Sequence, residues 1–196
     1  MRHPSASITL ILTAAIALGA ATCLAQPAAT PAAPGAANAQ PEGNIWQHHH
    51  VRVDFMGYTS AYTCDGVEGK VRDILRYLGA RKNITVEAHG CPHGPDSLEH
   101  LLWLVVDFDT LAPAPSGTAA ADLVPAAWKP VKIDAQHPFF MGEGDCELLD
   151  ALKPLVTGNF PVRSFDYSTS CAPYQVSMID FRVRGEVLKA NRGHDG

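Results

Sequence analysis

The chain has 196 residues, a length that fits one domain or two very small ones. Hydrophobic residues make up 46% of it, which is enough for a core and excludes a chain that is disordered throughout. The formal net charge of −5 argues against a nucleic-acid-binding protein, because such a protein needs a basic surface to contact phosphates. Five cysteines allow a disulfide framework. Nine histidines are an unusually high number for a chain of this length.

The N-terminal 25 residues have the pattern of a secretory signal peptide. Arg2 is their only fixed charge, residues 8–21 form an uncharged and largely apolar run, and Ala25 suits a cleavage site. We expect cleavage after Ala25, export to the periplasm or the outside of a bacterial cell, and no membrane span in the mature chain. Two alternatives stay open: an uncleaved N-terminal anchor, and a lipoprotein modified at Cys23, although the residues before Cys23 match a lipoprotein signal poorly.

Composition divides the remaining chain. Residues 26–43 contain seven alanines and four prolines without a periodic apolar face, which predicts a flexible tether. Residues 111–127 are again rich in alanine and proline and are predicted to be a loop. We therefore expect a single domain over residues 44–190, made of two similar halves at 45–110 and 128–190.

Each half contains one predicted helix that begins near a cysteine. In the helix after Cys64, Asp65 has the spacing of a capping-box residue and Gly79 suits a left-handed C-terminal residue. The helix after Cys146 has a weaker apolar face, and Pro154 is expected to kink or end it. The two apolar faces consist of Val67, Val71, Ile74, Leu75 and Leu78, and of Leu148, Leu149, Leu152 and Val156.

Strands are indicated on both sides of these helices. Apolar and polar residues alternate at 51–54 and 131–134, which open the two halves, and again at 84–89 and 179–184. Residues 101–108 are almost all apolar, so we expect them to form a central strand covered on both faces. The predicted fold class is α+β: a two-layer sandwich with a largely antiparallel sheet and two helices on one face.

The two halves resemble each other in order and spacing. Both read strand, helix, strand, strand, and the tripeptide Phe-Met-Gly precedes the first cysteine in each. We interpret this as a degenerate duplication of a β-α-β-β unit, with chance similarity as the alternative. The duplication predicts two disulfides, Cys64–Cys91 and Cys146–Cys171. A redox role for these cysteines is the alternative, but it lacks a CxxC motif.

Histidines are the strongest candidates for metal ligands. His48 and His50 would project to the same side of an extended chain, and His89, His93 and His100 lie close together in the sequence. Imidazoles in such numbers suit copper or zinc. No recognised zinc signature is present, and the cysteine between His89 and His93 is no ligand if it forms a disulfide.

The Phe-Met-Gly segments suggest a second candidate site. Met56, Tyr58, Phe140 and Met141 lie in the segments before the two helices. If these side chains are exposed, they would line a groove for a peptide or an apolar ligand. Burial in the core is the alternative and the commoner arrangement for such residues.

Recognised catalytic motifs are absent, and the remaining candidate catalytic residues form only weak patterns. The chain has no GxSxG, P-loop or GxGxxG motif, and the carboxylates Asp107 and Asp109 are better explained as turn residues than as an acid–base pair. The sequence therefore favours an exported, disulfide-braced binding or interaction module, whose partner would be an envelope protein or a small ligand. A periplasmic copper- or zinc-binding protein is the alternative, and a hydrolase is a third hypothesis.

Overall fold

The computed structural model of the chain describes residues 43–94, 96–174, 180–191 and 193. The predicted signal peptide and all but the last residue of the predicted tether lie outside these described residues. The first half contains β1 (Asn44–Met56), α1 (Cys64–Leu78), β2 (Thr85–His89) and β3 (Leu101–Pro113). The second half contains β4 (Ala126–Ile133), α2 (Cys146–Asn159), β5 (Val162–Ser170) and β6 (Asp180–Ala190). Two short 3-10 helices, η1 (Ala120–Asp122) and η2 (Glu143–Asp145), precede β4 and α2.

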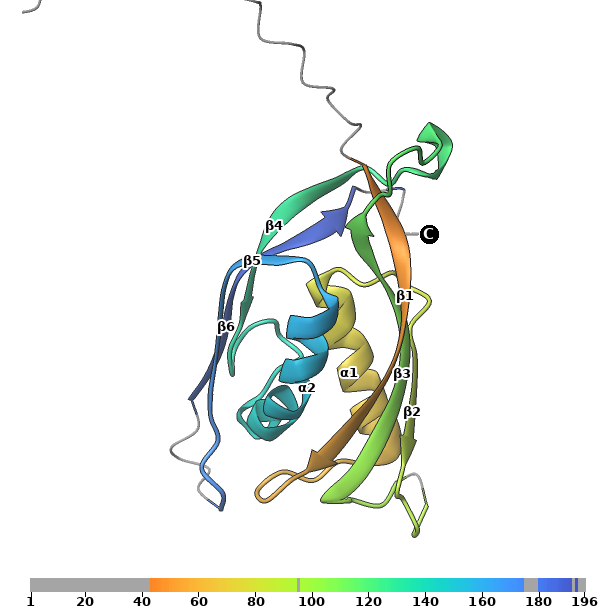
Figure 1. Cartoon of the computed structure of the whole chain (residues 1–196). Helices are drawn as coiled ribbons and strands as arrows, with labels where there is room; N and C mark the ends of the chain where they lie inside the picture. The colour runs from red at the N-terminus through yellow and green to blue at the C-terminus, as the bar shows by residue number, and fades with distance from the viewer. Residues whose placement is uncertain (1–42, 95, 175–179, 192, 194–196) are drawn as a thin grey trace, which may run out of the picture. The chain divides into compact units, whose positions relative to one another are not determined.

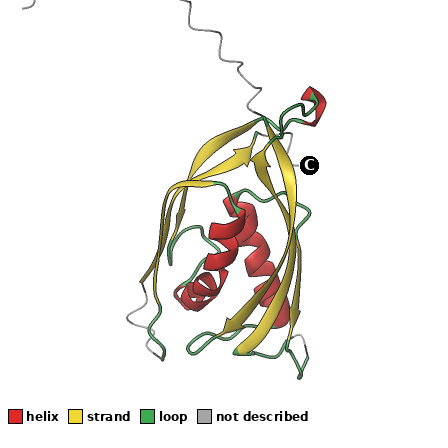
Figure 2. Ribbon diagram, in the orientation of Figure 1, coloured by secondary structure: helices red, strands yellow, loops and turns green. Residues whose placement is uncertain are grey.

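The strands form two antiparallel three-stranded sheets with the same internal order. The first sheet has the order β1-β3-β2 and the second the order β4-β6-β5, so the last strand of each half lies in the middle. The α+β class and the repeated β-α-β-β order are confirmed. Where the sequence led us to expect one sheet, the strands form two, and the helices lie between them (Figures 1 and 2). Pro130 in β4 lacks a backbone donor, which suits its position on an edge strand.

β3 is the central strand of the first sheet, as predicted, but only one of its faces is covered. Leu102 and Leu104 are buried, whereas Leu101 is 63% exposed and Trp103 is 37% exposed. The expectation that both faces would be covered is wrong, because both helices lie on the same inner face of this sheet (Figure 1). An apolar strand face is thereby left on the outside of the fold.

The helix ends agree with the sequence at some positions and differ at others. Gly79 adopts the predicted left-handed conformation after α1, with φ of 103°. The N-cap of α1 is Thr63 rather than Asp65, since the Thr63 hydroxyl accepts a hydrogen bond from the Gly66 amide at 3.0 Å. Pro154 does not end α2, because the turn that follows it is held by burial of its apolar side chains in the core.

The two predicted disulfides are both present. Cys64 is bonded to Cys91, and Cys146 to Cys171, with Cα–Cα distances of 6.4 and 5.7 Å. Each bond ties the first residue of a helix to the segment just after the next strand. The repeat therefore predicted the disulfide pairing correctly.

A polar junction joins the two halves beside their shared apolar core. The Asp145 carboxylate accepts a hydrogen bond from the Tyr62 hydroxyl at 2.7 Å and pairs with the Lys70 ammonium at 3.0 Å. Burial, reinforced by the Asp145 charge, raises the pKa of Tyr62 far above its ordinary value. Glu147 accepts hydrogen bonds from the backbone amides of residues 58–60 at 2.9–3.1 Å. Side chains of the second half thus fix the loop that leads into α1.

Candidate functional site on the outer face of the first sheet

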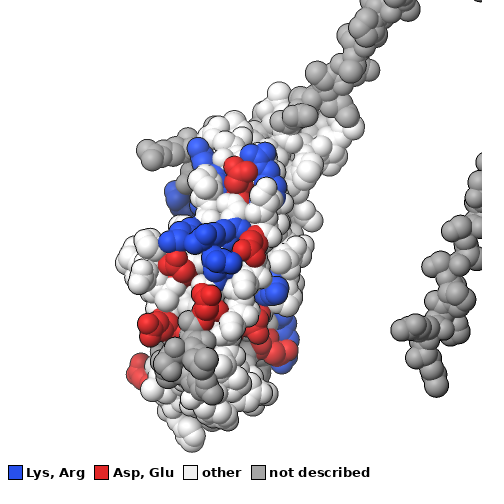
Figure 3. Space-filling view, turned by 90° about the vertical axis from the view of Figure 1, so that its left-hand side faces the viewer, with Lys and Arg blue, Asp and Glu red and all other residues white. Residues whose placement is uncertain are grey.

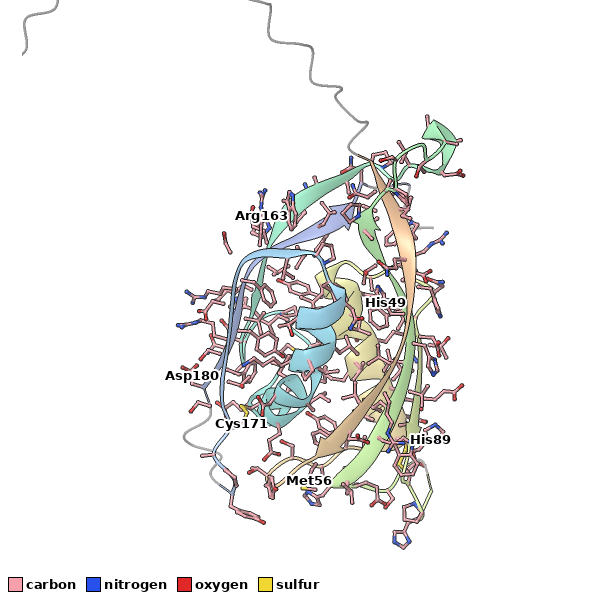
Figure 4. All side chains as sticks on the ribbon, in the orientation of Figure 1. His49, Met56, His89, Arg163, Cys171 and Asp180 are labelled. Carbon is pink, nitrogen blue, oxygen red and sulfur yellow. A yellow bond between two sulfur atoms is a disulfide. The ribbon has the colours of Figure 1, made fainter. Side chains whose placement is uncertain are left out.

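The exposed side of the first sheet gathers residues from all three of its strands. Val53 and Phe55 of β1 are buried, so the alternating residues of that strand point outward. Cross-strand pairing places Asp54 and His89 on either side of Trp103, and Met56 beside Leu101. Figure 4 shows Met56 at the end of β1, and His89 on β2 on the side away from the helices. We call this surface the Trp103 face; it consists of Arg52, Asp54, Met56, His89, Leu101 and Trp103.

The indole of Trp103 is held between two neighbours. The guanidinium carbon of Arg52 lies 5.2 Å from the ring centroid, and the His89 imidazole stacks at 5.5 Å with the planes 16° apart. Arg52 comes from β1 and His89 from β2, so neighbours from both flanking strands contact the indole. Arg52 also pairs with Asp54, with an N–O distance of 2.8 Å. The indole is therefore partly screened by these two neighbours and remains 37% exposed.

A groove of ≈ 750 Å³ runs beside this ring. Leu101, Leu102 and Trp103 line it together with Gly90, Cys91 and Pro92, and the paired side chains of Arg52 and Asp54 line it as well. Gly90 has φ of 96°, and a Cβ at this position would lie 3.2 Å from the Leu101 carbonyl oxygen, so a larger residue would be strained there. The Cys64–Cys91 disulfide anchors the same segment to α1. The groove thus has a fixed, largely apolar wall.

Exposed apolar side chains surround the groove. Leu101 and Met56 are 63% and 56% exposed, and they are neighbours across the sheet. A cluster of apolar side chains left on a surface marks a binding site more often than single apolar residues do. The outer face of the first sheet is therefore the best candidate surface for a partner.

The outer face of the second sheet is charged instead. Figure 3 shows Lys and Arg side chains gathered in a band on this side, with acidic side chains next to them. Arg163 pairs with Glu186 at 2.7 Å, and Arg182 with Asp166 at 3.4 Å. The hydrogen bond from Arg163 lowers the pKa of the Glu186 carboxyl, although burial opposes the shift. These charges largely compensate one another, so this face does not stand out as a site.

The four residues of the predicted groove, Met56, Tyr58, Phe140 and Met141, differ in how far they are exposed. Met56 belongs to the Trp103 face, and Tyr58 is exposed and packs edge-on against Tyr174. Phe140 is half-buried against the core, and Met141 is buried within it. None of these four residues lines the Trp103 groove itself. The alternative of core burial holds for Met141 alone.

The three clustered histidines are engaged in separate places. His89 stacks on Trp103, and His93 is exposed in the turn after β2. The Nδ1 atom of His100 donates a hydrogen bond to the Ser60 carbonyl oxygen at 3.0 Å and also lies 3.2 Å from the Gly57 carbonyl oxygen. Among the residues that the structure describes, no three His, Cys, Asp or Glu side chains are arranged to hold a metal ion. The copper or zinc hypothesis therefore stays a prediction without geometric support.

His48 and His50 project to the same side of β1, as predicted, and meet two carboxylates on β3. His48 Nδ1 lies 3.0 Å from an Asp109 oxygen, and His50 Nδ1 lies 2.8 Å from an Asp107 oxygen. The prediction that Asp107 and Asp109 are turn residues is wrong, because β3 continues through them to pair with the extended β1. Burial alone would raise the pKa of Asp109, but hydrogen bonds from Asn83 and His48 outweigh it and hold that pKa below its usual value.

Sequence reasoning missed Trp103 and Arg52. The signal was present in residues 101–108, where Trp103 occupies the same strand face as Leu101 and Asp107. The apolar run concealed this alternation, since a fully buried strand has the same composition.

No family model matches the chain, and no curated protein and no solved structure is significantly similar to it. Within the described part of the chain, neither helix has the length and apolar character needed to cross a membrane.

Proposed function

We propose that this protein is an exported, disulfide-braced binding module that engages an apolar segment of a partner protein through the Trp103 face. The observation that carries the proposal is the exposed pair Leu101 and Met56 beside the Trp103 groove. Two disulfides and the N-terminal signal pattern support an extracytoplasmic location.

The arrangement around Trp103 favours a peptide side chain over a stacked ring. A sugar or nucleobase that stacks on tryptophan needs a free ring face, and Arg52 and His89 would compete with it for this ring. The exposed part of the indole and the Leu101 side chain remain open to an aliphatic or aromatic side chain. An open groove also suits an extended segment better than an enclosed small molecule.

The charges at the groove favour an uncharged segment. Among the described residues that line the groove, Arg52 is the only cation, and it is already paired with Asp54. A carboxylate on the partner would compete with Asp54 for the Arg52 guanidinium. An ammonium group on the partner would be repelled by the same guanidinium. We therefore expect the residue that enters the groove to be apolar.

The test is selection of peptides from a random display library on the purified chain, followed by affinity measurement with synthetic peptides. Leu101→Asp introduces a charge at an exposed position of the face, and Phe139→Asp makes the same change at a residue that is 95% exposed elsewhere. We expect apolar peptides whose binding Leu101→Asp weakens by about tenfold or more and Phe139→Asp leaves unchanged. Peptides that bind both variants equally, or a failure to select any apolar peptide, would contradict the proposal.

A further inference from the structure

A second cavity lies at the opposite end of the first sheet from the Trp103 face. Its volume is ≈ 700 Å³, and residues of both halves line it. Asn44 begins β1 and Pro113 ends β3, while Trp128 comes from β4 and Leu188 from β6. The cavity therefore sits where the two sheets converge, at the upper end of Figure 1.

The loop between β3 and β4 supplies one wall of this cavity. Its residues 114–118 and Leu123 line the space. The loop is fixed at both ends by backbone hydrogen bonds, from the Ala114 amide to Gly43 at 3.0 Å and from the Val124 amide to Asn44 at 2.7 Å. A Cβ at Gly43 would come within 2.5 Å of the Leu123 side chain, so the chain packs tightly against this loop. Long loops inside compact domains are often functional covers.

The lining, over the residues that the structure describes, mixes apolar side chains with the polar Asn44, Ser116 and Thr118 and carries no charged side chain. Trp128, Leu123, Leu188 and Pro161 contribute its larger side chains. The Arg163 guanidinium lies 4.6 Å from the Trp128 ring centroid but does not line the cavity. Protein interiors leave few voids larger than a water molecule, and ligand pockets span roughly 300–1,000 Å³. This pocket is open to solvent on one side, and its size lies within the range of ligand sites.

We propose that this cavity binds an uncharged, largely apolar small molecule. The site is separate from the proposed partner surface, because it lies at the other end of β1 and β3 and shares no lining residue with the Trp103 groove. A charged ligand is disfavoured, since the described lining offers no side chain of opposite charge to pair with it.

The neutral fluorescent probe N-phenyl-1-naphthylamine tests this proposal on the purified chain. Ala114→Phe places a large side chain in the lining, and Ala119→Phe makes the same change on the same loop at an exposed residue outside the lining. We expect saturable one-to-one binding that Ala114→Phe weakens by about tenfold and that Ala119→Phe and Leu101→Asp leave unchanged. Dodecanol should displace the probe at lower concentration than dodecanoate.

Three results would overturn the proposal. They are the absence of saturable probe binding, equal effects of the two phenylalanine substitutions, and displacement by dodecanoate at least as effective as by dodecanol. Loss of probe binding in Leu101→Asp alone would assign the probe to the Trp103 face and would also contradict a site under the loop. Because that variant tests the partner surface independently, failure of one proposal is distinguishable from failure of the other.

Discussion

The ammonium group of Lys70 lies 3.0 Å from the carboxylate of Asp145, and the two residues belong to different halves of the fold. Both side chains are largely shielded from water, with exposed fractions of 23% and 6%. The Tyr62 hydroxyl donates to the other oxygen of the same carboxylate. The halves are therefore joined by a specific buried ion pair as well as by apolar packing.

Removing the cation of this pair should destabilise the protein strongly. We expect Lys70→Met to lower the free energy of unfolding by about 3 kcal/mol, because the largely buried Asp145 charge loses its cation and keeps only two neutral donors, the Tyr62 hydroxyl and the Gly142 amide. Urea unfolding followed by circular dichroism measures the loss. Lys129→Met, at an exposed position, is the matched control and should change stability by less than about 0.5 kcal/mol. Similar losses in the two variants would show that the ion pair does not hold the halves together.

Glu147 should hold the loop before α1 in place. Its carboxylate accepts from three consecutive amides at residues 58–60, so Glu147→Ala should cost about 1–3 kcal/mol and speed hydrogen exchange at these amides. Glu147→Gln keeps one acceptor oxygen and should lose less. Glu143→Ala, at an exposed position in η2, serves as the control. Unchanged exchange at residues 58–60 in Glu147→Ala would refute this role.

The two disulfides should contribute similarly to stability but differently to binding. They close loops with separations of 27 and 25 residues, so replacing either pair by alanine should cost about 3 kcal/mol in the chain-entropy model. Only Cys91 lines the Trp103 groove, so loss of the Cys64–Cys91 bond should also weaken binding of selected peptides. Loss of the Cys146–Cys171 bond is the internal control. Equal effects on peptide affinity would show that the first bond does not shape the groove.

Stability should fall in mild acid because of His49. Burial, with a smaller contribution from His48, lowers the pKa of His49 below its usual value of 6.5. The unfolded chain then binds a proton at a pH where folded His49 does not, so stability decreases as pH falls below about 6.5 and levels off below the lowered pKa. His49→Phe keeps a ring against Phe108, which lies 5.1 Å away, and removes this dependence. Unfolding free energies at pH 8 and pH 5.5 should differ less in the variant than in the wild type; an identical pH dependence would contradict the assignment.

Local patterns predicted the parts of the fold that depend on neighbouring residues. The period of apolar residues in α1 and the left-handed Gly79 follow from contacts within a few residues. The disulfide pairing followed from the repeat, since equivalent cysteines occupy equivalent positions in the two halves. Both signals lie in the spacing of residues along the chain, so the sequence alone reveals them.

The division into two sheets and the exposure of β3 depend on distant contacts. The strands of the two halves form separate sheets with the helices between them, and the alternation of apolar residues within a strand does not show which sheet it joins. The apolar run at Leu101–Pro113 likewise does not show which of its faces is covered. The candidate site was therefore only partly predictable: Met56 and His89 were named from the sequence, whereas Trp103 became apparent only through its cross-strand neighbours.

The most direct measurement of the central claim uses the three tryptophans of the chain, at positions 46, 103 and 128. Each gives one indole N–H signal in a proton–nitrogen correlation spectrum of the labelled protein, which can be assigned by single substitutions to phenylalanine. On saturation with a selected apolar peptide, we predict a shift of the Trp103 indole signal while those of Trp46 and Trp128 stay in place. A bound peptide that shifts the Trp46 or Trp128 signal and leaves Trp103 unchanged would contradict binding at the Trp103 face.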